Sequence, residues 1–143
     1  MRESVFEVQV RLALNDSYHP FGVFWNNKTG YSDGEMVKNH DPFPGRGAGD
    51  LIGCVFGLWI EVENKEQKGK WRELQKVRNT LVTNCGGLYI VCREIGFNCA
   101  GDFDAGFVKL RLAIDKRVRV YRGDFAAEML ETMRIKKAAQ GHK

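Results

Sequence analysis

The stretch WIEVENKEQKGKW, residues 59–71, begins as an apolar strand and ends in a row of charges. Alternate residues of a strand point to the same face, so Glu61, Glu63 and Lys65 are expected to share one face. The apolar residues before and between the two glutamates would then pack into the core. The charged face has two interpretations: a solvated edge strand that resists aggregation, or part of a site that binds a cation.

The preceding segment supplies another carboxylate for such a site. Residues 50–56 and 58–65 are predicted to be two strands joined by a tight turn. This hairpin returns Glu63 and Lys65 to the end of the sheet where Asp50 begins. Neighbouring carboxylates repel each other unless a cation lies between them, and oxygen ligands suit Mg²⁺ or Mn²⁺. A lysine nearby can position a water for attack, so the sequence predicts part of a metal-dependent hydrolytic site.

The flanking segments predict an α/β domain. Phe6, Val10 and Leu14 recur at every fourth residue, which indicates an amphipathic helix at the start of the chain. The next predicted elements are a strand at residues 21–26, a loop at 27–48, the hairpin, a helix at 70–85 and a strand at 88–92. This order is typical of a central mixed sheet flanked by helices.

Composition narrows the class of protein. A chain of 143 residues with 43% hydrophobic content fits one globular domain, and its net charge of +4 is only mildly basic. The four cysteines and three histidines show no metal-ligand or catalytic spacing. There is no apolar run long enough to cross a bilayer and no leader segment, so the chain is expected in the cytoplasm, without a membrane partner.

Two features that could contact nucleic acid are assigned structural roles. GRGAGD, residues 45–50, has the glycine density of a phosphate-binding loop, but it precedes a strand rather than a helix. It is interpreted as a flexible approach to Asp50. Trp25, Trp59 and Trp71 could stack on bases, yet each lies in a segment predicted to face the core.

An aspartate followed by Glu-x-Lys on the next strand resembles the active-site pattern of the PD-(D/E)XK nuclease superfamily. The flanks over residues 1–93 resemble its virus-type replication-repair nuclease branch, the VRR-NUC domain, as found in stand-alone phage or bacterial proteins. The similar segments, in order, are WNNKTG, GAGDLIG, ENK, GKWRELQ and GGLYIVCR. The resemblance implies a restriction-endonuclease-like core and a DNA endonuclease that uses Mg²⁺ or Mn²⁺ to hydrolyse phosphodiester bonds.

The resemblance also implies particular metal ligands. It places the metal on Asp50 and Glu63, together with the backbone carbonyl of Asn64 and a carboxylate from the first helix. Glu3 is the preferred helix carboxylate, and Glu7, one turn later, is the alternative. Ordinary charges near a helix N-terminus remain the other interpretation of both.

Three further residues enter through the same resemblance. Lys65 would position the attacking water, and Gln75, in the following helix, would orient Lys65 or a DNA phosphate. The family has an aliphatic residue where this chain has Asn64. Glu61-x-Glu63 offers a second frame for the motif, but the spacing to the glycine and glutamine elements favours Glu63-x-Lys65.

The substrate and the assembly follow only by analogy. Small stand-alone members resemble junction-cleaving dimers, so branched DNA cut by a homodimer is expected. A non-catalytic DNA-binding module that kept the fold is the competing class of protein. Hydrolysis of RNA is a third interpretation.

Residues 94–143 lie outside the resemblance and are predicted to form an extension packed on the same domain. Residues 107–122 alternate between apolar and charged types, which predicts a β-hairpin with an apolar underside. Its other face would carry only positive charges, on Lys109, Arg111, Arg117, Arg119 and Arg122. Such a face suits a DNA backbone, although a solvated sheet face is the alternative. Asp124 is predicted to cap a final helix that frays into the basic tail.

Overall fold

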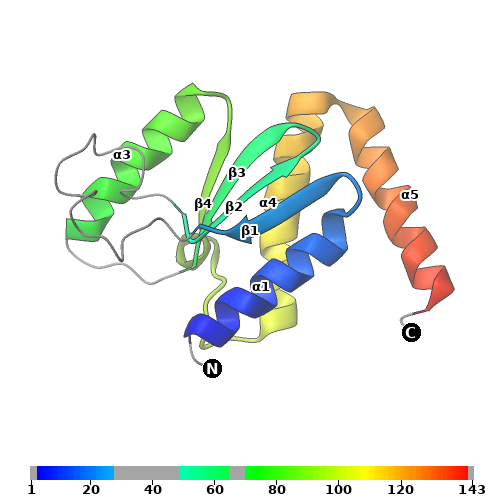
Figure 1. Cartoon of the computed structure of the whole chain (residues 1–143), viewed down its shortest axis with the longest axis horizontal. Coiled ribbons are helices and arrows are strands. Elements are labelled where there is room, and N and C mark those ends of the chain that lie inside the picture. The colour runs from blue at the N-terminus through cyan, green and yellow to red at the C-terminus, as the bar shows by residue number, and fades with distance from the viewer. Residues whose placement is uncertain (1–2, 28–48, 65–69, 142–143) are drawn as a thin grey trace.

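A computed structural model describes residues 3–27, 49–64 and 70–141 of the chain (Figure 1). The elements are α1 (Glu3–Tyr18), β1 (Gly22–Asn26), β2 (Leu51–Val55), β3 (Leu58–Glu63), α3 (Lys70–Asn84), β4 (Leu88–Val91), η1 (Cys92–Ile95), α4 (Phe103–Arg122) and α5 (Asp124–Gln140). The α/β class and the order of elements through β4 are as predicted. None of the described helices is both long and apolar enough to cross a membrane.

The described strands form one mixed sheet in the order β1-β2-β3-β4 (Figure 1). β2 pairs antiparallel with β1 and with β3, whereas β3 and β4 are parallel. The β2–β3 turn consists of Phe56 and Gly57, which have φ angles of 51° and 84°. Positive φ at both central positions matches the right-handed twist of the strands, so this turn sets the register of the hairpin.

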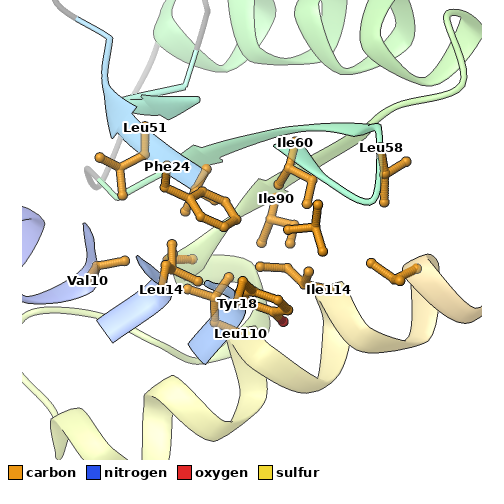
Figure 2. Close-up of a cluster of buried hydrophobic side chains, with 14 of the residues drawn as sticks. Val10, Leu14, Tyr18, Phe24, Leu51, Leu58, Ile60, Ile90, Leu110 and Ile114 are labelled. Carbon is orange, nitrogen blue, oxygen red and sulfur yellow. The ribbon is translucent and has the colours of Figure 1, made fainter. Parts of the chain in front are cut away.

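One face of the sheet is covered by α1 and α4, and the main core lies between these helices and the sheet (Figure 2). The predicted spacing in α1 is confirmed, because Phe6, Val10 and Leu14 are at most 1% exposed. Tyr18 extends the same stripe. The core residues from α4 are Leu110, Ile114 and Val118, and those from the sheet include Phe24, Leu51, Leu58, Ile60 and Ile90.

The opposite face of the sheet carries α3 over its β3–β4 side, where Val82 packs with Tyr89 and Val91. On this face, Trp25 of β1 and Trp59 of β3 are 42% and 43% exposed. The prediction that these two tryptophans face the core is therefore wrong. Both lie in largely apolar segments, and the pattern did not show which part of this face α3 leaves uncovered. The side chain of Trp71 lies outside the described residues.

The predicted C-terminal hairpin is wrong, because residues 103–122 form the single helix α4. Its core residues Leu110, Ile114 and Val118 recur at every fourth position, and Val108 and Leu112, assigned to the same strand face, are 43% and 58% exposed. Asp102 caps the helix, accepting hydrogen bonds from the backbone N–H groups of residues 104 and 105. Gly123, with φ 88°, ends it.

The helix α5 folds back along α4 and is held by one polar cluster (Figure 1). Asp115 accepts hydrogen bonds from the Tyr18 hydroxyl at 2.7 Å and from Arg134 Nη1 at 2.8 Å. Arg134 also lies over the Tyr18 ring and donates to the carbonyl of Ser17. The α5 helix continues to Gln140, so the expected fraying is wrong, and Asp124 makes no side-chain cap at its start.

The strand β1 lies at one edge of the sheet and is held there by Asn15 of α1. The Asn15 side chain donates from Nδ2 to the Phe24 carbonyl at 3.0 Å and accepts from the Phe24 N–H at 2.8 Å. These two bonds fix the end of α1 against the first strand. They also satisfy both backbone groups of Phe24.

Candidate functional site

Asp50 and Glu63 meet at the open end of the β2–β3 hairpin. Leu51 pairs with Val62, so the register places Asp50 opposite Glu63, one position farther from the turn. Leu51 and Val62 face the main core, and both carboxylates therefore lie on the α3 face of the sheet. The backbone N–H of Asn64 donates to Asp50 Oδ2 at 2.9 Å, which ties the end of β3 to the start of β2.

Asp50 and Glu63 bring two carboxylates together at the end of the hairpin, where Glu63 has little access to water. Glu63 is only 5% exposed, although it is a carboxylate. Burial raises the pKa of the Cys92 thiol, and the charges of Glu63 and Asp50 raise it further. Burial and the nearby acids, led by Glu63, also raise the pKa of Tyr89. Burial is the larger cause of both pKa shifts, and the contribution of the acids shows that Glu63 and Asp50 lie near both side chains.

Two buried amide groups near this end have donors without partners among the described residues. Asn64 is 4% exposed; its Oδ1 accepts from the Cys92 thiol at 3.3 Å, while its Nδ2 donates to nothing. Gln75 of α3 is also 4% exposed, and its Nε2 has no partner. An unsatisfied buried donor costs about 1–3 kcal/mol, so native proteins tend to keep one where a ligand or water will accept from it.

Gln75 lies toward the carboxylates because of the direction of α3. The helix connects β3 to the parallel strand β4, so it runs antiparallel to β3. Arg78 contacts Glu61. Gln75, about one turn earlier in the helix, therefore lies toward Glu63.

Glu61 shares the face of Glu63 but has a structural role. The Glu61 side chain is fully buried and is paired with Arg78, whose Nε donates to Oε1 at 2.9 Å and whose Nη2 donates to Oε2 at 2.7 Å. Trp59 Nε1 donates to Oε2 at 2.8 Å, and the Gly49 N–H donates to Oε1 at 3.2 Å. These contacts occupy both oxygens of Glu61. The hydrogen bond to Glu61 raises the pKa of Arg78, so the guanidinium stays charged.

Gly49 shows why the glycine-rich approach ends in a glycine. A Cβ atom at this position would lie 2.8 Å from the backbone N and O of Val62. Only glycine allows the chain to pass so close to β3 and then place Asp50 opposite Glu63. At this residue the approach is tightly packed, so the interpretation as a flexible segment is wrong here.

Several predicted site residues fall partly or wholly outside the described residues. Lys65 lies there completely. Glu3 begins α1, but its side chain is not described. The helix runs antiparallel to β1 and therefore parallel to β2, so its start lies at the Asp50 end of the sheet. Within the described ranges, no group of three or more His, Cys, Asp or Glu side chains is arranged to hold a metal ion.

The five basic residues predicted to line a hairpin lie instead around α4, and helical spacing does not place them on one face. Arg117 donates to the Gly86 carbonyl at 3.2 Å, and Arg122 donates to the Phe56 carbonyl at 2.8 Å. Both contacts lie at the end of the sheet that holds the β2–β3 turn, which is the end far from Asp50.

The other three have different surroundings. Arg119 is paired with Asp124 at 3.6 Å, Lys109 is exposed, and Arg111 has a buried Nε without a described partner. Because these residues lie on a helix and not on a hairpin, the argument that they form one positive face no longer applies. DNA binding by these residues stays a prediction.

Sequence reasoning missed two features of this region. The Glu61–Arg78 pair joins residues from β3 and α3 and leaves no local pattern in the sequence. The exposure of Trp25 and Trp59 was also missed, because it depends on which part of the sheet α3 covers. Comparison of the chain with protein-family models, curated proteins and solved structures gives no significant match.

Proposed function

We propose that this chain is a metal-dependent nuclease that hydrolyses phosphodiester bonds in DNA, with a restriction-endonuclease-like core and Mg²⁺ or Mn²⁺ as cofactor. The observation that carries the proposal is the position of Asp50 opposite Glu63 at the open end of the β2–β3 hairpin. This geometry is held by the close approach of Gly49 to Val62 and by the hydrogen bond from the Asn64 N–H to Asp50. A solvated edge strand needs neither.

The donor chemistry fits a hard divalent cation. Asp50, Glu63 and the backbone carbonyl of Asn64 are oxygen ligands from adjacent strands, and Glu3 would add a carboxylate from the same end of the molecule. A bound cation would polarise the phosphate and lower the pKa of a water. The proposed ligand set includes a carbonyl and an undescribed side chain, so it does not need three described acidic side chains.

The chain would supply the remaining groups. Lys65, two positions after Glu63, would hold the attacking water. The unpartnered Nε2 of Gln75 would donate to a phosphate oxygen or orient the water, since it is buried on the helix beside the carboxylates. The saturated hydrogen bonding of Glu61 supports the Glu63-x-Lys65 frame of the motif, because Glu61 has no oxygen left for a metal.

The test removes one charge without changing shape. Asp50→Asn keeps an oxygen that accepts from the Asn64 N–H, so the fold should survive while the metal loses an anionic ligand. We expect cleavage to fall about a hundredfold or more, and Lys65→Ala to have a comparable effect. Cleavage of labelled linear, flapped and four-way DNA, and of RNA, would be measured with Mg²⁺, Mn²⁺ or EDTA. Mn²⁺ binding, followed by calorimetry, should weaken in parallel.

Asp124→Asn is the matched control, because its carboxylate is exposed on α5. Undiminished cleavage by Asp50→Asn would reject the nuclease proposal. The second candidate is a non-catalytic DNA-binding module that kept the fold, and it is favoured by Asn64, which stands where the family has an aliphatic residue. A wild type that binds DNA but cuts no substrate in either metal would select that candidate. Sedimentation of the same samples would test the proposed homodimer.

A further inference from the structure

An uncharged aromatic surface lies beside the carboxylates on the α3 face of the sheet. Val23, Trp25 and Trp59 are 53%, 42% and 43% exposed there. Val23 and Trp25 lie on β1 and Trp59 lies at the turn end of β3, whereas α3 contacts Glu61 of β3 and residues of β4. The three side chains form an apolar surface on otherwise regular strands, which is uncommon unless the surface binds something.

The two indole rings are held in a fixed arrangement. Their centroids are 6.5 Å apart and the ring planes are inclined by 80°. Trp59 cannot rotate freely, because its Nε1 donates at 2.8 Å to Glu61, which is itself fixed by Arg78. A rigid, exposed indole is a preorganised stacking surface, since little conformational entropy is lost when a ligand binds to it.

The register places this pair close to the candidate site. Trp25 is opposite Ile52, and Ile52 lies two residues after Asp50 on the same face. Trp59, which pairs with Cys54, lies one row farther from the carboxylates. Alternate residues of a strand are roughly 7 Å apart, so Trp25 is about 7 Å from the row of Asp50 and Glu63. That spacing is comparable to about two stacked bases at roughly 3.4 Å each.

We infer that Trp25, packed against Trp59, stacks on an unpaired base near the scissile phosphodiester, so the substrate carries a single-stranded segment at the site. This inference rests on the proposed nuclease function. A base inside a duplex already stacks on both neighbours, whereas an unpaired base has a free face. The surface carries no charge with which to bind a phosphate, and it lies within reach of one that the carboxylate-bound cation would hold.

Trp25→Ala gives the cleanest test, because Trp59 also supports Glu61. Binding of labelled oligonucleotides would be measured in Ca²⁺, using one sequence as a single strand, a duplex and a flapped duplex. Stacking contributes about 1–3 kcal/mol per base, so single-strand and flap affinity should fall about 5- to 150-fold, with duplex affinity unchanged. Trp25→Phe should retain most of the affinity. Leu112→Ala is the matched control, because Leu112 is 58% exposed on α4, across the sheet.

The outcomes separate this inference from the nuclease proposal. Equal single-strand affinity in Trp25→Ala and wild type would overturn the inference, whether or not the wild type cuts DNA. Loss of single-strand binding in Trp25→Ala, with a wild type that never cuts, would support the stacking surface and reject the nuclease. A wild-type dimer that Trp25→Ala converts to a monomer would show that the surface binds a second copy, and would also overturn the inference.

Discussion

Glu61 and Glu63 stand two residues apart on one strand, yet the structure gives them different surroundings. Glu61 has the Arg78 guanidinium, an indole N–H and a backbone N–H around it. Glu63 is buried beside Asp50. The partners of Glu61 compensate its buried charge and support the fold, whereas Glu63 is proposed to hold a cation together with Asp50. The roles follow from the partners rather than from the residue type.

Removal of Arg78 should therefore destabilise the fold, because Glu61 would stay buried without its cationic partner. Arg78→Met is expected to lower the free energy of unfolding by about 3–5 kcal/mol, because a buried carboxylate loses its main partner. The double variant Arg78→Met with Glu61→Leu should recover much of this loss. Urea denaturation of wild type, both single variants and the double variant completes the cycle. A double variant no more stable than Arg78→Met would contradict this account.

At the scale of the element, α4 shows how a short alternating pattern misleads. Its apolar residues occur at every second position from Val108 to Ile114, and also at every fourth position from Leu110 to Val118. The four-residue period is the one that the structure follows, because it places these apolar residues on one side of a helix, where the sheet buries them. An N-cap at Asp102, a stop at Gly123 and no glycine or proline at residues 107–122 were signals for one helix.

The N-cap can be tested directly. Asp102→Ala should lower the free energy of unfolding by about 0.5–2 kcal/mol, because two backbone N–H groups lose their acceptor. Asp102→Ser should retain most of the stability. Asp104→Ala is the control, since Asp104 lies in the first turn without capping it. Denaturant melts of the three variants would be compared, and equal losses at both aspartates would refute the cap.

The hairpin and the pair at its end were predictable from the sequence, because a tight turn fixes which residues meet. The two-residue turn of Phe56 and Gly57 places Asp50 opposite Glu63. The open tryptophan surface and the partner of Glu61 were not predictable, since both depend on where α3 lies across the sheet. Local periodicity carries information about faces, but not about which neighbour covers them.

At the scale of the whole molecule, one ion pair joins three helices. Asp115 of α4 binds Tyr18 of α1 and Arg134 of α5. Burial, together with Asp115, raises the pKa of Tyr18, so the phenol stays protonated and continues to donate at ordinary pH. Among the described residues, the other polar contacts of α5 with α1 and α4 are the Lys137 hydrogen bond to the Asp16 carbonyl and the exposed Arg119–Asp124 pair, so this cluster should control how firmly the last helix is attached.

Asp115→Ala should release α5. We expect the free energy of unfolding to fall by about 1.5–3 kcal/mol, the usual contribution of hydrogen bonds to a charged group. The amides of residues 124–140 should exchange with solvent faster than those of the sheet, as measured by hydrogen–deuterium exchange. Asp124→Ala, which breaks an exposed pair with Arg119, should cost less than about 1 kcal/mol. Unchanged exchange in α5 would show that apolar packing alone holds it.

The two hydrogen bonds between Asn15 and Phe24 also affect the tendency of the protein to aggregate. An unprotected edge strand recruits other strands, and β1 carries no charged residue to prevent this. The carboxamide of Asn15 takes the place of a neighbouring strand at this residue, because it binds the N–H and the carbonyl of Phe24 that an incoming chain would need. Asn15→Ala should therefore scatter more light as protein concentration rises, while the monomer keeps its secondary structure. A single amide would then be what keeps this sheet from growing into a fibre.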